Sequence, residues 1–422
     1  MACILVTMDT LNTPEFLPII LGTDSNAYGV ARSIHENYGI SSVCLGKAPL
    51  NFTSDSRILS RSIDPNLATD EVFLTRLDEL ATRFPDLPKI IIPCGDAYAE
   101  QLSRNRETLT ARGFLFNIIT QDLQKRLEDK ISFYQICEEY GLPYPETKVI
   151  SPEQAASGSV QLPFQYPVAL KASDSIEYLE LSFPGKKKAY TIQDESELNL
   201  VLKQIYHSGY TGSMVAQDFI PGGPENMAVL NAYVNRQGKV RMMCFGQCVL
   251  DAVLPAEIGN YHALYSDDGS EIYPVYLDFL EKIGYRGFAN FDLKRDPRDG
   301  IYKVFEINLR QGRSSYYTSL GGCEFITYLI NDLLDLDDPA KPAHLHRQRG
   351  KMWLYVDPCL VRWYAPPAIR KRALDVMHSG WSFTQWYPQD RSVKRWLRYW
   401  RSRLSSIKSY LKYASRPPRS HV

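Results

Sequence analysis

The sequence has no continuous apolar run of the roughly 18–20 residues that a membrane-spanning helix needs. Its N-terminus does not combine a basic start with a long apolar run and a small-residue cleavage site, the pattern of a secretory signal. It contains no internal repeat and no low-complexity tract. These absences argue against a membrane-spanning, secreted or repeat protein, and we expect a cytoplasmic globular protein.

Cysteine is sparse, with eight cysteines spread over 422 residues. A disulfide scaffold would be a short chain dense in cysteine, so the sequence does not indicate one. Cys244 and Cys248 have no histidine near them in the sequence, and we expect small buried hydrophobic residues there rather than zinc ligands. His344 and His346 lie in a polar, proline-containing stretch (335–351), which we expect to be a solvated linker.

The net charge is zero, but the charges are unevenly distributed. From Arg391 to the end of the chain there are ten Lys or Arg residues and no Asp or Glu. The remaining 390 residues therefore carry 38 basic and 48 acidic side chains. An acidic body with a basic tail raises the question of an anionic partner for the tail.

Short apolar segments alternate with helical patterns in the first 120 residues. Strands are predicted at 18–22, 43–45 and 89–96, and the segment between the second and third contains a helical pattern over 69–84. Alternating strands and helices predict an α/β N-terminal domain (1–120) with a parallel, doubly wound sheet. Ligands of such sheets bind at the carboxyl ends of the strands.

The pattern changes after this domain. One helix is predicted over 122–140, and it is followed by short β-branched strands with helices near 195–207 and 273–284. This pattern predicts α+β lobes in which antiparallel strands carry helices on one side. The predicted organisation therefore has four segments in order: 1–120 (the N-terminal domain), 121–335 (the two lobes), 336–390 (a C-terminal extension) and 391–422 (the basic tail).

The strongest chemical signal is FANFDLKRDPRDGIYKVFEINLRQG (288–312), in which an Asp-Pro-Arg-Asp-Gly turn predicts a hairpin. Asp292 lies on the first strand. Glu306 and Asn308 are two apart on the second, which places their side chains on one face. Such oxygen ligands suit Mg²⁺, and Arg310 on the same face can bind a phosphoryl group or an acyl phosphate through two hydrogen bonds. Taken alone, the pattern also fits a solvated hairpin.

Two lysines and a glycine-rich turn indicate a nucleotide. Lys130 closes the charged run QKRLEDK, and Lys171 ends the apolar strand YPVALKA, where a charge is costly unless it is paired. A nucleoside triphosphate would supply that pairing. In VAQDFIPGGPEN (215–226) a strand runs into a turn whose backbone groups can bond an adenine edge, and Glu225 can accept hydrogen bonds from ribose hydroxyls. Taken alone, this turn also fits an ordinary hairpin loop.

The order of Lys130, Lys171, QDFIPGGPE, Asp292 and EINLR resembles that of the ATP-grasp ligases, in which two β-rich lobes grip ATP. Within that superfamily, FLPIILGTDSNAYGVARSIHENYGI and ALKASDSIEYLELSFPGKKKAY are similar to the D-aspartate ligases. That family attaches D-aspartate to the lysine side chain of a peptidoglycan precursor. The resemblance covers about residues 16–330.

The resemblance implies roles for individual residues. Those implied to contact the phosphates, the adenine and the ribose of ATP are Lys130, Lys171, Gln217, Asp218, Ile220 and Glu225. Those implied to bind Mg²⁺ are Asp292, Glu306 and Asn308, and Arg310 is implied to contact the acyl phosphate. The chain departs from the usual pattern because 172–188 offers one glycine and three lysines instead of a glycine-rich loop, and because position 217 is Gln where acidic residues are frequent.

The reaction implied is a two-step ATP-dependent ligation that produces ADP and phosphate. An amino-acid carboxylate, D-aspartate by the resemblance, is activated as an acyl phosphate and then joined to an amine, the lysine side chain of a peptidoglycan precursor. Such chemistry relies on positioning and charge neutralisation rather than on a protein nucleophile. Two alternatives remain: an ATP-grasp ligase that joins other amino acids or metabolites, and a nucleotide-binding protein without turnover.

The basic tail (391–422) has the pattern of an amphipathic helix that ends before Pro417–Pro418. The apolar residues that recur at three- and four-residue steps are Val393, Trp396, Leu397, Trp400, Leu404, Ile407 and Leu411. Trp beside basic residues suits an anionic membrane surface, which is one interpretation. The other is that this apolar face docks on the protein's own acidic body. We expect no nucleic acid partner, because no recognised binding module accompanies the tail.

Overall fold

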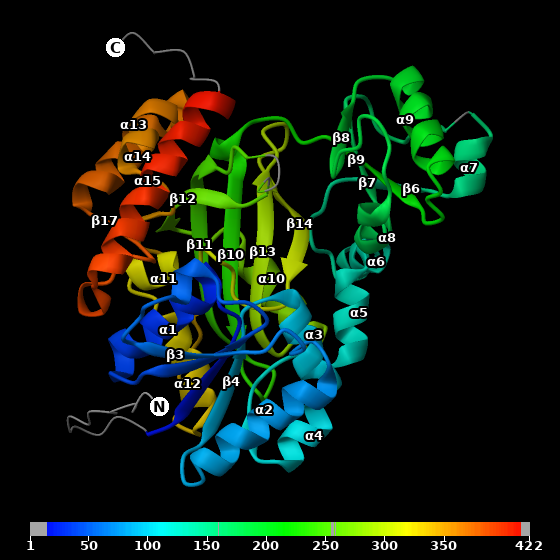
Figure 1. Ribbon diagram of the computed structural model, residues 1–422. Coiled ribbons are helices and arrows are strands. Elements are labelled where there is room, and N and C mark those ends of the chain that lie inside the picture. The colour runs from blue at the N-terminus through cyan, green and yellow to red at the C-terminus, as the bar shows by residue number, and fades with distance from the viewer. Residues whose placement is uncertain (1–14, 159, 255–256, 258, 415–422) are drawn as a thin grey trace. The chain divides into compact units, whose positions relative to one another are not determined.

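The computed structural model (Figure 1) describes residues 15–158, 160–254, 257 and 259–414. The chain divides into a larger unit (Met1–Gln121, Gly223–Phe291 and Asn308–Val422) and a smaller unit (Asp122–Gly222 and Asp292–Ile307). Cys3, the N-terminal 14 residues and the predicted stop at Pro417–Pro418 lie outside the described residues. Among the described residues, no helix has the length and apolar character required to traverse a bilayer.

The N-terminal part of the larger unit is the predicted parallel α/β sheet, which the structure confirms. Its strands are β1 (Leu17–Leu21), β2 (Ser42–Gly46), β3 (Leu59–Ile63), β4 (Lys89–Pro93) and β5 (Phe114–Leu115), all parallel in the order β3-β2-β1-β4-β5. Its helices are α1 (Ser25–Tyr38), α2 (Asp70–Arg83), α3 (Asp96–Arg104) and α4 (Arg106–Ala111). Helix α1 begins where the carboxylate of Asp24 accepts from Ala27 N, and it ends at Gly39, whose φ of 68° suits glycine. The sheet therefore presents the loops after β1 and β4 at one edge.

A second, eight-stranded sheet has the order β14-β13-β10-β11-β12-β16-β17, with β15 paired to β11. The strands are β10 (Met227–Val234), β11 (Val240–Asp251), β12 (Tyr261–Asp267), β13 (Gly287–Arg295), β14 (Tyr302–Asn308), β15 (His344–Leu345), β16 (Met352–Leu354) and β17 (Trp381–Phe383). The helices are α10 (Tyr273–Lys282), α11 (Tyr316–Leu320), α12 (Phe325–Leu333), α13 (Pro358–Tyr364), α14 (Pro367–Ser379) and α15 (Val393–Tyr413). One core joins this sheet to α1 and α12, and another joins it to α13, α14 and α15.

The smaller unit contains a four-stranded antiparallel sheet in the order β6-β9-β7-β8 (green in Figure 1). Its strands are β6 (Thr147–Ile150), β7 (Val168–Ala172), β8 (Ala189–Ile192) and β9 (Met214–Asp218). Its helices are α5 (Gln121–Glu128), α6 (Lys130–Glu139), α7 (Pro152–Ala156), α8 (Ser175–Glu180) and α9 (Glu195–His207). The apolar face of α9 packs on this sheet in one buried core, as the α+β pattern predicts.

The single helix predicted over 122–140 is wrong, because the structure breaks it at Asp129. The backbone of Asp129 is extended, and its carboxylate accepts a hydrogen bond from Ser132 N at 2.8 Å. An aspartate that caps a new helix competes with continuation of the old one. Lys130 consequently opens α6 instead of lying inside a longer helix.

Most of the stretch 335–351 is exposed, as the solvated linker predicts, but the prediction is wrong for His346 and for the short strand before it. His344 and Leu345 form β15, which pairs in parallel with Met242 and Met243 of β11, and His346 is only 3% exposed. Strand β12 pairs with β11 only from Phe245 onward, so β15 supplies partners for the earlier part of that strand. Buried backbone groups need such partners, and a short segment provides them here.

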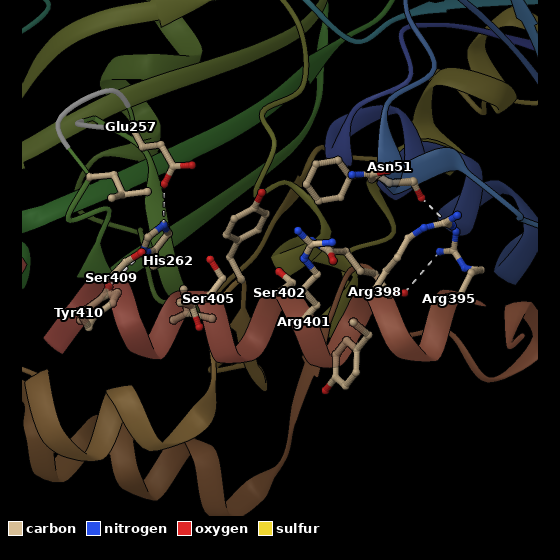
Figure 2. A pocket seen from close by; sticks show the side chains of 17 residues that line it. Asn51, Glu257, His262, Arg395, Arg398, Arg401, Ser402, Ser405, Ser409 and Tyr410 are labelled. Atoms are coloured by element: carbon tan, nitrogen blue, oxygen red, sulfur yellow. Dashed lines mark hydrogen bonds and ion pairs between the residues drawn. The ribbon is translucent and has the colours of Figure 1, made fainter. Parts of the chain in front are cut away.

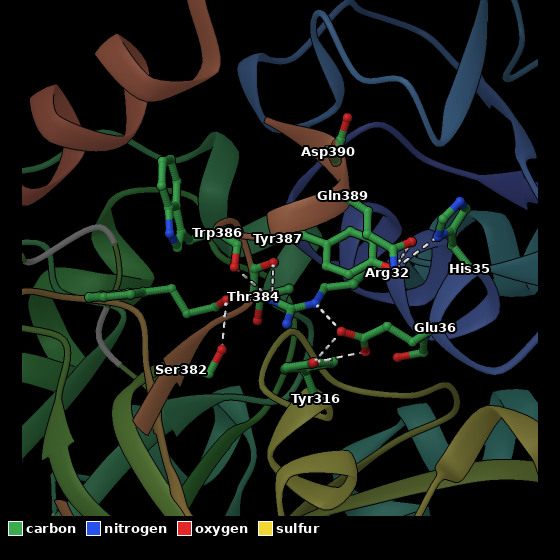
Figure 3. A network of polar contacts seen from close by, with 12 residues as sticks. Arg32, His35, Glu36, Tyr316, Ser382, Thr384, Trp386, Tyr387, Gln389 and Asp390 are labelled. Atoms are coloured by element: carbon green, nitrogen blue, oxygen red, sulfur yellow. Dashed lines mark hydrogen bonds and ion pairs between the residues drawn. The ribbon is translucent and has the colours of Figure 1, made fainter. Parts of the chain in front are cut away.

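A buried arginine ties the C-terminal segment to α1 (Figure 3). Arg32 Nη1 donates to the carbonyls of Phe383, Thr384 and Trp386 at 2.6, 3.0 and 3.2 Å, and Arg32 Nε donates to Glu36 at 2.9 Å. The Arg32 side chain is 6% exposed. One guanidinium group donates to three peptide carbonyls and to one carboxylate, so this contact depends on the planar shape of the arginine side chain.

Helix α15 confirms the predicted amphipathic helix, but its docking is the reverse of the one considered above. Three of its arginines face the body: Arg395 donates to Phe52 O, Arg398 pairs with Asp55, and Arg403 Nε lies 2.6 Å from Asp357. The other basic residues of the helix are exposed, namely Lys394, Arg401, Lys408 and Lys412. The apolar side is exposed instead, with exposed fractions of 40–76% for Val393, Trp396, Leu397, Trp400, Leu404 and Leu411. Ile407 differs from these six, because it packs partly buried against the core.

We expect Arg32→Ala to lower the free energy of unfolding by roughly 2–4 kcal/mol, because it leaves several buried carbonyls without a donor. Arg104→Ala is the matched control, since Arg104 pairs with Asp70 at the surface and such pairs contribute within about 1 kcal/mol. Urea unfolding of both variants checks the expectation. Equal losses in the two would contradict it.

Candidate active site

Lys130, Lys171 and Lys188 form a cluster in the smaller unit, and the carboxylate of Glu306 acts on the first two of them. The alternation of β7 buries Val168, Leu170 and Ala172 and turns Lys171 to the other face of the sheet. Burial lowers the pKa of Lys171 below its usual value, the Glu306 carboxylate opposes that shift, and Lys130 and Lys188 reinforce it. Lys171 therefore has two positively charged neighbours and one negatively charged neighbour.

Lys130 belongs to the same cluster because α6 begins there. Burial lowers its pKa and so does Lys188, whereas the carboxylates of Glu306, Asp129 and Asp174 raise it. Of the three lysines at 186–188, Lys188 thus joins the cluster, whereas Lys186 Nζ donates to Leu181 O at 2.6 Å and Lys187 Nζ lies over the Tyr190 ring. Ammonium groups held where burial disfavours their charge are suited to a polyanionic ligand such as a triphosphate.

The two predicted carboxylate ligands lie on the hairpin β13–β14. Asp292 is half-buried on β13 and Glu306 is exposed on β14. The predicted turn is confirmed, because Asp296 N donates to Ile301 O and Gly300, with a φ of 77°, donates to Asp296 O. The carboxylate oxygens of Asp292 and Glu306 are the kind of ligand that Mg²⁺ prefers.

The predicted adenine residues surround the end of β9. Gln217 is 1% exposed and its Nε2 donates to Thr147 Oγ1 at 3.1 Å. Asp218 accepts from Arg298 Nη1 at 3.0 Å, and Ile220 O accepts from Lys294 Nζ at 2.8 Å. The sequence did not single out Lys294 or Arg298, although both lie within the hairpin motif.

Asn308 and Arg310 lie in the larger unit. Asn308 Nδ2 donates to Asn290 Oδ1 at 3.2 Å, and Asn290 Nδ2 in turn donates to Asn231 Oδ1 at 3.1 Å. Because the Asn308 amide nitrogen is fixed in this way, its oxygen faces Arg310, whose Nη2 lies 3.4 Å from Oδ1. Asn290 therefore orients a predicted metal ligand, a role that the sequence did not reveal.

Arg310 is held by a two-point ion pair. Its Nε lies 3.0 Å from Asp96 Oδ1 and its Nη2 donates to Asp96 Oδ2 at 3.1 Å. Arg310 and Arg313 also act on Asp24, whose pKa burial raises and these arginines lower. Asp24 and Asp96 follow β1 and β4, so these four charges gather at the carboxyl edge of the parallel sheet.

Glu225 lies in a separate turn of the larger unit. Its carboxylate accepts from Gly223 N at 3.0 Å, and its own carbonyl accepts from Gln247 Nε2 at 3.0 Å. The predicted ribose contact by this residue stays a prediction.

No protein-family model matches the chain. The chain is 41% identical over 399 residues to D-aspartate ligase of Enterococcus faecium (strain Aus0004), and the match covers 92% of this chain and 94% of that protein. The chain belongs to the D-aspartate ligase family.

Solved structures support the fold of this D-aspartate ligase family member. The biotin carboxylase domain of Hydrogenobacter thermophilus 2-oxoglutarate carboxylase matches with a TM-score of 0.57 at 16% identity, covering 80% of this chain and 73% of that one. L-amino acid ligase from Bacillus licheniformis matches with a TM-score of 0.54 at 15% identity, covering 76% and 74%. The predicted combination of a parallel N-terminal sheet with ATP-grasp lobes is confirmed.

A cavity of about 470 Å³ lies in the larger unit of this family member (Figure 2). The polar side of α15 forms one wall through Ser402, Ser405 and Ser409, and His262 and Glu257 lie at one end. Burial lowers the pKa of His262, although the carboxylate of Glu257, 3.5 Å from its Nε2, opposes the shift. None of the predicted site residues is among the described residues that line this cavity.

We expect Lys171→Met to leave the unliganded protein at least as stable as the wild type at neutral pH. The pKa of Lys171 is lower in the folded than in the unfolded chain, so its charge opposes folding until the pH rises through that range. Saturating ATP adds roughly 2.7 kcal/mol at 100 times its dissociation constant, and we expect the variant to lose more than half of that gain.

Thermal unfolding with and without ATP measures both effects. Lys203→Met on α9 is the control, because Lys203 is exposed in the same unit and should keep the full ATP response. A Lys171→Met protein that is stabilised by ATP as strongly as the wild type would remove this lysine from the site.

Proposed function

We propose that this protein is an ATP- and Mg²⁺-dependent ligase that joins D-aspartate to the lysine side chain of a peptidoglycan precursor. The observation that carries the proposal is the 41% identity to D-aspartate ligase along nearly the whole of both chains. The lysine cluster supports the ATP half of the reaction, because ammonium groups whose charge burial disfavours suit a triphosphate.

The lysine cluster holds the phosphates of ATP in this proposal. Lys130 and Lys171 bind phosphate oxygens, and we add Lys188 to them because its charge acts on both. The adenine and ribose are contacted by the residues that the resemblance implies: Gln217, Asp218, Ile220 and Glu225. The ion pair between Asp218 and Arg298 keeps the Asp218 carboxylate in a fixed orientation.

Mg²⁺ is bound by Asp292, Glu306 and Asn308, and when bound it supplies charge neutralisation at the transferring phosphoryl group. The donor set fits this ion, because all three side chains offer hard oxygen ligands and the Asn308 nitrogen is already occupied by Asn290. The proposal requires the Asn308 oxygen to face the ion, and the hydrogen bond to Asn290 favours that orientation.

The substrate carboxylate attacks the γ-phosphate of ATP, which gives an acyl phosphate and ADP. The lysine amine then attacks the acyl carbon and displaces phosphate, which leaves an amide. Arg310 donates to the acyl phosphate oxygens, and its ion pair with Asp96 holds the guanidinium plane in position. Positioning and charge are the contributions of the protein to both steps.

We expect D-aspartate to support Mg²⁺-dependent ADP release, and hydroxylamine to trap a D-aspartyl hydroxamate. Glu306→Gln and Asn308→Ala should each reduce the rate on the order of 10²-fold or more, because each removes an oxygen ligand from a phosphoryl-transfer site. Glu195→Gln on α9 is the matched control, since this carboxylate is exposed and has no assigned role in the reaction.

Two outcomes separate the parts of this proposal. A hydroxamate formed from L-aspartate or D-alanine but not from D-aspartate would contradict the substrate and leave the ligase chemistry standing. Near-wild-type ADP release by both hairpin variants, with folding verified, would contradict the metal assignment.

We propose further that α15 binds an anionic membrane surface. Its exposed apolar side carries Trp396 and Trp400, and Lys394 beside them is 74% exposed. Apolar burial and attraction to acidic lipids act together on such a helix. A ligase that serves wall-precursor synthesis would gain from lying near a membrane that carries lipid-linked precursors.

We expect the full chain to sediment with vesicles that contain an anionic phospholipid at low salt, and to be released as salt screens the charges. Replacing Trp396, Leu397 and Trp400 by Glu should reduce the bound fraction roughly tenfold. Leu200→Glu is the control, because Leu200 on α9 is as exposed as Leu397, at 57% each. Equal sedimentation of the triple variant and the control would contradict membrane binding by α15.

A further inference from the structure

A cluster of two cysteines and a histidine lies inside the larger unit, apart from the residues assigned to the ligase reaction. Cys244 lies on β11, Cys323 between α11 and α12, and His346 directly after β15. All three are buried, and one ligand atom from each lies within 4.8 Å of the others. Cys244 and Cys248 are buried as the sequence predicts, but Cys244 has histidine neighbours that the sequence did not indicate.

The register of β15 on β11 explains why these residues meet. Met242 pairs with His344 and Met243 with Leu345 in parallel, and His346 N donates to Met243 O at 2.9 Å. Continued by one residue, this register places His346 beside Cys244. Side chains two apart share a face, so His344 lies on that face as well.

Cys323 approaches that face from the turn after α11. Its Sγ lies 3.9 Å from His344 Nδ1. The turn passes very close to the histidines, because a Cβ at Gly321 would lie 3.1 Å from His346 Nε2 and collide with Ser266. Glycine at 321 is therefore needed for this approach.

The imidazole of His346 is oriented by its surroundings. Its Nε2 lies 2.7 Å from Gln348 O, and a carbonyl oxygen can only accept, so Nε2 carries the proton. The lone pair of the neutral ring is then on Nδ1. A histidine whose second nitrogen donates to a carbonyl is the usual arrangement for a metal ligand.

We propose that Cys244, Cys323 and His346 bind a thiophilic divalent cation such as Zn²⁺, with His344 as the fourth ligand. Zn–S bonds of about 2.3 Å and Zn–N bonds of about 2.0 Å in a tetrahedron separate ligand atoms by roughly 3.3–3.8 Å. The 3.9 Å between Cys323 Sγ and His344 Nδ1 is close to that range. His344 Nδ1 also lies 2.6 Å from the Tyr328 hydroxyl, a contact that gives way when the nitrogen binds the ion.

Binding displaces the two thiol protons to solvent, and the two thiolates neutralise the dication inside the protein. The ion would link three segments that are far apart in the sequence: β11, the turn after α11, and β15. The site is therefore structural, and it does not rest on the ligase reaction.

The test begins with the full chain. Metal is removed by a chelator under reducing conditions, Zn²⁺ is returned in competition with a chromophoric chelator, and Co²⁺ is added in a parallel titration. We expect one equivalent of Zn²⁺ per chain, a thiolate-to-Co²⁺ charge-transfer absorption band, and a higher melting temperature with metal than without it.

Cys323→Ser and Cys244→Ser should each weaken Zn²⁺ binding at least tenfold and abolish the charge-transfer band. Cys248→Ser is the matched control, because Cys248 is equally buried on the same strand but its Sγ lies beside Asp251 instead. Circular dichroism establishes that the variants fold.

The proposal is overturned if the reduced wild-type chain takes up no stoichiometric Zn²⁺ and gives no charge-transfer band. It is overturned equally if Cys323→Ser binds the metal as the wild type does. A Cys244–Cys323 disulfide in the purified protein, with no metal uptake after reduction, would identify the cluster as a redox pair instead.

Discussion

Strand β11 imposes the main constraint on the larger unit. It has 12 residues, of which 11 are buried, so its backbone groups must be paired on both edges and its side chains covered on both faces. Strand β10 pairs with one edge, and β12 and β15 divide the other between them. Helices α1 and α12 share a core with one set of its side chains, and α13, α14 and α15 share a core with another. Helices as far apart in the sequence as α1 and α15 therefore both contribute to the cores that cover β11.

Charge is distributed differently in the two units. In the smaller unit, burial disfavours the charges of Lys130 and Lys171, Lys188 adds to that effect, and Glu306 opposes it. In the larger unit, Arg310 has its own carboxylate partner in Asp96. The first arrangement suits recruitment of a polyanion, and the second suits orientation of a guanidinium that acts later in a reaction.

Local sequence patterns predicted the elements that local physics determines. The parallel sheet, α9 and the hairpin around Asp292 and Glu306 follow from periodicity and turn chemistry, and the structure contains them. The break at Asp129 was missed because a capping aspartate and a helical aspartate look alike in sequence. Partners distant in sequence were also missed: Asn290 beside Asn308, Asp96 beside Arg310, and His346 beside Cys244. Their spacing carries no period, and only the tertiary structure brings them together.

The contact between Arg32 and residues 383–386 has a consequence for how the chain is made. A ribosome releases the N-terminal sheet first, but the carbonyls that satisfy Arg32 emerge about 350 residues later. Until then the guanidinium on α1 must stay hydrated, and the face of α1 around it cannot be buried in its final form. Helix α1 and residues 383–386 therefore complete their folding together. Proteolytic removal of residues 383–386 would take away the carbonyls that accept from Arg32. The stability of the N-terminal sheet with α1 is therefore coupled to the presence of this C-terminal segment.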